Sequence, residues 1–73
     1  MSIRWSTERY DQLESAARSS KRVVLVRRGT EYIVIAVAVR SEGSMESLIG
    51  RLPMTGEELT FVLDDLESFQ VLE

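Results

Sequence analysis

Apolar positions recur at helical spacing only near the beginning of the chain. Tyr10, Leu13 and Ala17 follow one another at intervals of three and four residues. This spacing predicts a helix over residues 7–19 with one narrow apolar stripe. Ser6 can cap the helix, because its hydroxyl accepts a hydrogen bond from a backbone amide of the first turn. The predicted helix is short and amphipathic, so it needs a further surface to pack against.

The rest of the chain has the pattern of strands joined by short turns. Gly29 marks the first turn, residues 41–44 the second, and Pro53 with Gly56 the third. Gly50 interrupts an apolar run and predicts a bulge or a sharp bend there. Residues Asp64, Asp65, Leu66 and Glu67 predict a single helical turn. The strands predicted between these signals are 22–27, 31–40, 45–51, 58–63 and 68–72.

One helix followed by five short strands predicts a single α+β domain over residues 1–73. The favoured arrangement is a strongly bent antiparallel sheet of the small-barrel type, with the helix capping one open end. The alternative is an open antiparallel sheet with the helix packed on one face.

Charge divides the chain into two halves of opposite sign. Residues 1–40 carry eight basic and four acidic side chains, a net charge of +4, whereas residues 41–73 carry one basic and eight acidic, a net charge of -7. Such halves can attract one another within one fold or between copies placed head to tail. The overall charge of -3 argues against nonspecific nucleic-acid binding, which depends on many contacts to phosphates.

The composition excludes several kinds of chemistry. The 73 residues include no cysteine and no histidine, so disulfides, thiolate metal sites and histidine-dependent nucleophilic catalysis are absent. The acidic residues near 64–67 lack the spacing of a calcium-binding loop, and residues 28–30 and 55–57 lack the glycine pattern of a phosphate-binding loop. We therefore interpret these segments as turns, and we expect no enzyme activity, metal ion or cofactor.

Four basic residues form the candidate binding site for a nucleic acid or another anion. They flank the first predicted strand, and they are Lys21, Arg22, Arg27 and Arg28. Because side chains alternate along a strand, Arg22 and Arg27 face opposite sides and the four cannot share one face. The alternative interpretation is that these cations keep an exposed strand edge soluble. Trp5 is interpreted as a hydrophobic staple that packs on Tyr10.

The C-terminal segment 59–72, LTFVLDDLESFQVL, resembles the end of WYL domains. These are Sm-like, SH3-type small barrels of bacterial regulators, in which an F-x-L-D-x-I/L segment turns into a closing strand. Residues 13–27 are similar to the beginning of such domains. The resemblance covers roughly residues 13–72 and implies a small barrel that binds a nucleotide or nucleic acid.

The sequence departs from the WYL pattern where ligands are bound. Leu48-Ile49-Gly50 lies near the place of the Trp-Tyr-Leu motif, and Leu59 and Asp65 stand where the family commonly has arginines that contact the ligand. The resemblance therefore transfers no binding residue to this chain.

We expect a non-enzymatic binding or assembly module that makes protein–protein contacts, including self-association into a homo-oligomer. The strands carry more apolar residues than one helix can cover, and the oppositely charged halves favour contacts between copies. The alternative is a WYL-like regulatory module that binds a nucleotide or nucleic acid. The longest apolar run, residues 33–39, is much shorter than the roughly 20 residues of a membrane-spanning helix. No secretion signal is visible, so we expect a cytoplasmic location and no membrane partner.

Overall fold

The computed structural model describes residues 5–72. Arg4 and Glu73, which enter the charge balance above, lie outside these described residues. The elements follow one another as a helix, α1 (Thr7–Arg18), and five strands, with a 3-10 turn, η1 (Leu63–Asp65), before the last. The strands are β1 (Arg22–Arg27), β2 (Thr30–Glu42), β3 (Met45–Arg51), β4 (Glu58–Val62) and β5 (Leu66–Val71).

Helix α1 begins at its predicted cap. The backbone amide of Arg9 donates to the Ser6 hydroxyl oxygen at 3.2 Å, which satisfies one of the free amides of the first turn. Leu13, Ala16 and Ala17 are buried on one side of the helix. Ala16 was not part of the predicted stripe, so the buried surface of α1 is wider than the sequence pattern indicated.

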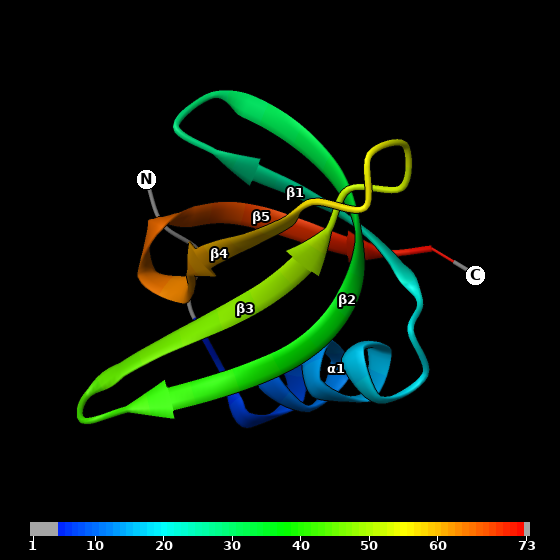
Figure 1. Ribbon diagram of the computed structural model, residues 1–73. Helices are drawn as coiled ribbons and strands as arrows, with labels where there is room; N and C mark the ends of the chain where they lie inside the picture. The colour runs from blue at the N-terminus through cyan, green and yellow to red at the C-terminus, as the bar shows by residue number, and fades with distance from the viewer. Residues whose placement is uncertain (1–4, 73) are drawn as a thin grey trace.

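All neighbouring strands pair antiparallel, in the order β4-β3-β2-β1-β5. The sheet is bent, and Figure 1 shows it curving around α1. The α+β prediction of one N-terminal helix and a five-stranded, bent antiparallel sheet is confirmed. The sheet does not close into a continuous cylinder, because β4 and β5 stand at its two ends and do not pair with each other.

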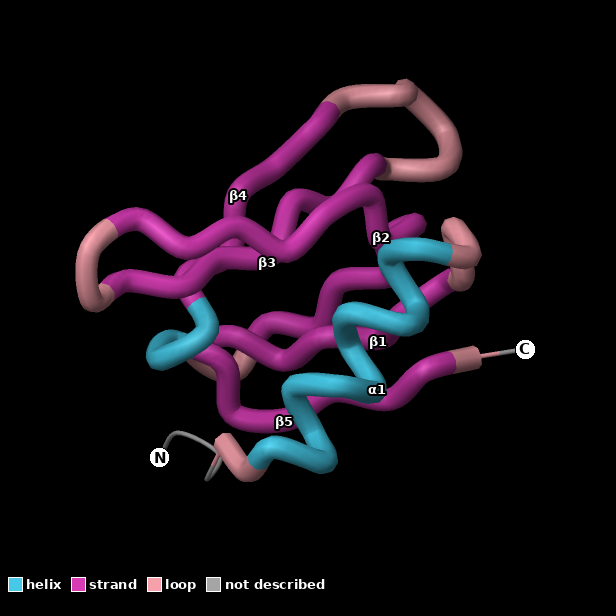
Figure 2. Tube along the Cα trace, turned by 90° about the horizontal axis from the view of Figure 1, so that it is seen from below, coloured by secondary structure: helices cyan, strands magenta, loops and turns pink. Residues whose placement is uncertain are grey.

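Figure 2 shows α1 lying over one face of the sheet, and the side chains of the core come from the helix and from that face. We call this face of the sheet the inner face and the opposite face the outer face. Burying these side chains away from water supplies most of the stabilisation of the fold. The fully buried larger side chains are Phe61, Leu13, Leu25, Leu48, Leu66, Val23 and Val34.

The irregularity expected at Gly50 lies in the opposite strand. The register of β2 with β3 shifts between Ala36 and Ala38, next to the pairing of Ala36 with Gly50. Gly50 has a different role, because a Cβ atom there would lie 2.7 Å from Cγ2 of Val34. The position therefore requires glycine for clearance in the core, and β2 carries the bulge.

Several element boundaries differ slightly from those predicted. β2 is longer at both ends than residues 31–40, and β5 begins at Leu66, two residues earlier than predicted. The turn between β1 and β2 places Arg28 at φ 52° and Gly29 at φ 78°, which are left-handed conformations that favour a tight hairpin. No helix among residues 5–72 is long and apolar enough to cross a membrane.

Candidate functional site

The structure separates the four basic candidate residues into two pairs. Lys21 and Arg22 lie at the start of β1, whereas Arg27 and Arg28 lie at its end beside the hairpin turn. Five residues of strand place Arg22 and Arg27 roughly 17 Å apart. The two pairs therefore belong to opposite ends of the strand and do not form one patch.

Arg27 is held by aromatic side chains of the inner face. Its guanidinium carbon lies 5.1 Å from the ring centroids of both Tyr32 and Phe61. Its Nη2 donates a hydrogen bond to the Tyr32 hydroxyl oxygen, with 3.3 Å between the nitrogen and the oxygen. A cation over an aromatic face is stabilised by the quadrupole of the ring. The half-buried Arg27 therefore joins β1 and β2 to β4 and is occupied by contacts within the fold.

Arg28 and the neighbouring turn are held by the acidic residues after β4. The Arg28 guanidinium lies 3.8 Å from the Asp65 carboxylate, and the amide of Gly29 donates to Oε1 of Glu67 at 3.1 Å. The acidic residues interpreted as a turn thus anchor the β1–β2 hairpin. Among the described residues, no group of three or more acidic side chains has an arrangement that could hold a metal ion.

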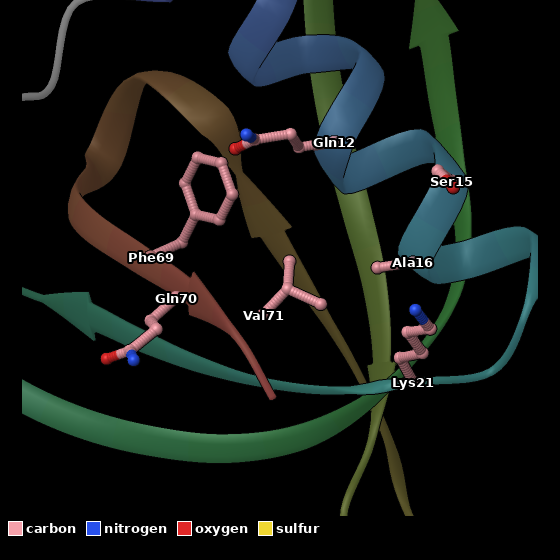
Figure 3. A pocket seen from close by; sticks show the side chains of 7 residues that line it. All are labelled: Gln12, Ser15, Ala16, Lys21, Phe69, Gln70 and Val71. Carbon is pink, nitrogen blue, oxygen red and sulfur yellow. The ribbon is translucent and has the colours of Figure 1, made fainter. Parts of the chain in front are cut away.

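Lys21 lines a groove between α1 and β5. The groove has a volume of about 540 Å³ and contains one cationic side chain and no acidic one, in a chain with 12 acidic residues. Figure 3 shows Phe69 and Val71 directed toward the helix and Gln70 directed away from it. The residues that line the groove are Gln12, Ser15, Ala16, Lys21, Phe69, Gln70 and Val71.

One side of this groove is the edge of β5, where some backbone groups are free. The amide of Leu72 donates to the carbonyl oxygen of Arg22 at 2.8 Å, which fixes the alternation of hydrogen bonds between β5 and β1. Every second residue of β5 therefore forms its backbone hydrogen bonds with β1. The backbone N–H and C=O groups of the residues between them point away from β1. The N–H and C=O groups of Phe69 and Val71 therefore face the open edge, where they are available to another strand.

The opposite end of the sheet has a second free edge, on β4. The amide of Leu52 donates to the carbonyl oxygen of Glu57 at 2.8 Å, and the same alternation continues along β4. The groups that face the open edge here belong to Glu58, Thr60 and Val62. Their side chains are exposed or half-buried on the outer face, whereas Phe61 between them is buried.

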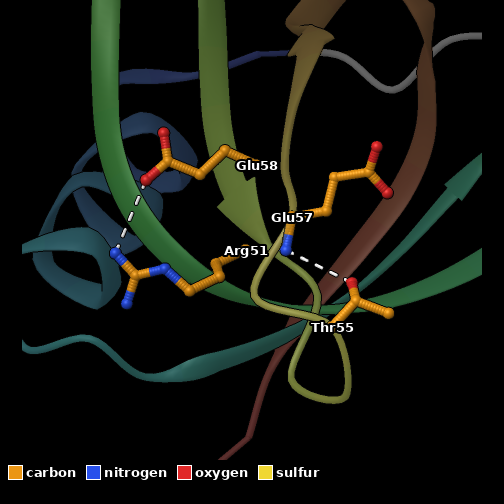
Figure 4. Close-up of polar contacts among 4 residues, drawn as sticks. All are labelled: Arg51, Thr55, Glu57 and Glu58. Atoms are coloured by element: carbon orange, nitrogen blue, oxygen red, sulfur yellow. Dashed lines mark hydrogen bonds and ion pairs between the residues drawn. The ribbon is translucent and has the colours of Figure 1, made fainter.

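The loop before β4 has the polar contacts of a closed turn. The amide of Glu57 donates to the Thr55 hydroxyl at 3.2 Å, and the Arg51 guanidinium lies 3.5 Å from the Glu58 carboxylate, as drawn in Figure 4. The amide of Gly56 donates to the carbonyl oxygen of Leu52 at 2.8 Å. These bonds support the interpretation of residues 55–57 as a turn.

Trp5 packs on Phe69 of the groove in a way that the sequence pattern did not indicate. Its ring stacks on Phe69 with centroids 5.3 Å apart and planes inclined by 6°, and its Nε1 donates to the carbonyl oxygen of Leu63 at 2.9 Å. The staple interpretation considered only neighbours in the sequence, whereas these partners lie 58 and 64 residues away. A tryptophan just before a helix gives no signal for such distant partners.

A comparison of the chain with known protein families, with curated proteins and with solved structures finds no match. The features of the molecule that bear on function are the groove, the two free edges and the charges around them.

Proposed function

We propose that this chain is a non-enzymatic assembly module that binds an additional β-strand at the β5 edge, including a strand of another copy. The observation that carries the proposal is the free edge at Phe69 and Val71, which forms one side of a groove bounded by α1. Strand addition is a common mode of protein recognition, in which backbone hydrogen bonds supply affinity and side-chain pockets supply specificity.

The surroundings of the groove favour a protein partner. Main-chain groups at an unpaired edge are a template for another chain, and the half-buried apolar side chains of Phe69 and Val71 give it a surface to contact. The outer face adds exposed apolar area, because Ile33 near the beginning of β2 is 49 % exposed. Both features are typical of surfaces that bind other proteins.

The positions of the basic residues weigh against the nucleotide or nucleic-acid alternative. Arg27 is engaged with two aromatic rings, and Arg28 lies beside Asp65. Only Lys21 and Arg22 remain as a pair without an ion-pair partner among the described residues, which is few contacts for a phosphate backbone. Fluorescence anisotropy with short RNA and DNA tests the alternative, and binding that is lost in Arg22→Ala would favour it.

We further propose that the chain is a divergent relative of the WYL and Sm-like small barrels. The support is the order of elements, a helix and then five strands, and the turn after Phe61. There the segment Leu63–Asp65 forms η1 and leads directly into β5, which pairs with β1.

The proposal is tested by blocking the β5 edge without disturbing the fold. Proline at position 71 removes an amide hydrogen that faces the open edge, so Val71→Pro costs no hydrogen bond to β1. Val71→Thr retains the amide and is the matched control. We expect light scattering to show concentration-dependent association of the parent and of Val71→Thr, and a monomer for Val71→Pro.

Circular dichroism of Val71→Pro at low concentration verifies that the variant is folded. A parent protein that stays monomeric at every concentration and salt level would contradict self-association. Association that persists in a folded Val71→Pro variant would show that the β5 edge is not the contact.

A further inference from the structure

We propose that the strand added at β5 is β4 of a second copy, which runs antiparallel to it with Val62 opposite Phe69 and Thr60 opposite Val71. In this arrangement the outer face of the second copy's β4 packs beside α1 of the first. The inference rests on the proposed function and specifies the partner strand, its register and the surface that contacts the helix.

The alternation of hydrogen bonds determines which faces meet. On β5 the groups free to bond belong to Phe69 and Val71, whose side chains lie on the inner face. On β4 they belong to residues such as Thr60, whose side chain lies on the outer face. Residues directly opposite in an antiparallel pair place their side chains on the same side of the sheet. The outer face of β4 is therefore continuous with the inner face of β5, and the second copy curves away from α1.

The outer face of β4 has a shape that suits this contact. It forms part of a hollow of about 650 Å³ over β2, β3 and β4, to which Ile49, Thr60 and Val62 contribute apolar atoms. The exposed side of α1 that borders the groove carries Gln12 and Ser15, which are small or flexible polar side chains. Pairing of the two strands thus brings the β4 side of this hollow, at Thr60 and Val62, next to the helix of the other copy.

The charge of Lys21 favours the same direction, whereas this register also sets Glu58 opposite the acidic Glu73, a like-charge pair that opposes it. Lys21 lines the groove at the end of β5 and has no ion-pair partner among the described residues. When Thr60 of the second copy lies opposite Val71 of the first, Glu58 of the second copy lies two residues farther along its β4. Its side chain is then on the same side of the sheet as Lys21 of the first copy and closer to it than Thr60 is. Among residues 5–72 the exposed Glu58 carboxylate forms one ion pair, with Arg51 at 3.5 Å, and it can interact with Lys21 of the other copy as well.

A charge exchange tests the register. We expect Lys21→Glu and Glu58→Lys each to weaken association by up to roughly fivefold, which is the upper end of the range for an exposed charge pair. The double variant should regain most of the loss. Arg22→Glu changes the same charge at the adjacent position on the opposite face and is the matched control, for which Glu58→Lys should give no recovery.

Chemical cross-linking tests the contact between the helix and the outer face. The chain has no cysteine, so single-cysteine variants provide unambiguous sites. A mixture of Ser15→Cys and Thr60→Cys should form a cross-linked dimer with a short bifunctional maleimide. A mixture of Ser15→Cys and Ile33→Cys, with the second thiol on β2 far from the β4 edge, should give a much lower yield.

The outcomes separate this inference from the proposed function. Thr60→Pro blocks the β4 edge without loss of a bond to β3, and it should abolish association as fully as Val71→Pro does. If only Val71→Pro abolishes association, the β5 edge binds another strand, such as β5 of the second copy, and this inference is wrong. Equal yields in the two cross-linking mixtures, or no recovery in the charge exchange, would also overturn it.

Discussion

The two end strands of the sheet, β5 and β4, are both unpaired on one side but differ in their surroundings. Next to the β5 edge lie α1 and Lys21, which bound a groove, and the Trp5 ring, which stacks on Phe69. No strand pairs with the open side of β4 within the described residues, and Glu57 and Glu58 lie at its start. The β5 edge can thus accept a strand and β4 can be the strand that is added, so a single chain can provide both halves of a head-to-tail contact.

The largest effect is expected for the side chain that holds β4 in place. Phe61 is fully buried and contacts the ring of Tyr32 edge-on, with centroids 5.2 Å apart. Phe61→Ala should lower the free energy of unfolding by about 3–5 kcal/mol, as a large cavity forms in the core. Thr60→Ala, one residue earlier on the exposed side, should change it by less than about 0.5 kcal/mol.

Urea denaturation of both variants measures this difference. Similar losses in the free energy of unfolding at the two positions would mean that the inner and outer faces of β4 are not distinct. β4 would then not be a preformed binding strand.

A smaller effect is expected at Trp5, which belongs to the surroundings of β5. Trp5→Ala removes the stacking on Phe69 and the hydrogen bond to Leu63, for a loss of about 2–3 kcal/mol. Trp5→Phe retains an aromatic ring and should lose about 1 kcal/mol. Thermal unfolding followed by circular dichroism gives both values, and equal losses would assign the whole effect to the hydrogen bond.

The sequence was sufficient to predict the fold because its signals are local. The apolar stripe through Leu13, the capping hydroxyl of Ser6 and the turn at Gly29 each involve neighbouring residues, and all three are present in the structure. Apolar and polar residues also alternate along β4, and Phe61 lies on its buried side.

The candidate site was less predictable, because it depends on contacts between distant residues. Lys21 and Arg27 looked alike in the sequence, yet one lines the groove and the other lies against two aromatic rings. The register of β5 with β1 determines which of its residues direct their backbone groups toward the open edge. The alternation of apolar and polar residues in the sequence does not define this register. The partnership of Trp5 with Phe69 arises only once the two ends of the chain meet.

The contact of Arg27 gives a prediction about how β4 is joined to the rest of the sheet. Arg27→Met retains the length of the side chain but removes its charge over Tyr32 and Phe61, so we expect a loss of about 1 kcal/mol. Arg22→Met, at the other end of β1, should change the free energy of unfolding by less than about 0.5 kcal/mol. Urea denaturation measures both, and equal effects would show that the aromatic contacts of Arg27 contribute no stability.

The smallest expected effect concerns Tyr10, which ties the helix beside β5 to the β2–β3 hairpin. A hydrogen bond with Ser41 lowers the pKa of the Tyr10 phenol, but a hydrogen bond with Glu46, partial burial and the charges of Glu46 and Glu14 outweigh it and raise the pKa above 10.0. The folded state therefore favours the neutral phenol. Its contribution to stability is complete below the ordinary pKa and is lost as the pH rises through the folded-state value.

Absorbance titration of tyrosinate in a Tyr32→Phe background reports Tyr10 alone, because the chain contains two tyrosines. Glu46→Gln removes the nearest negative charge and should lower the pKa of Tyr10, whereas Ser41→Ala removes the lowering hydrogen bond and should raise it further. A pKa that is unchanged in Glu46→Gln would mean that the hairpin does not hold this side of α1. The wall of the groove would then depend on the buried face of the helix alone.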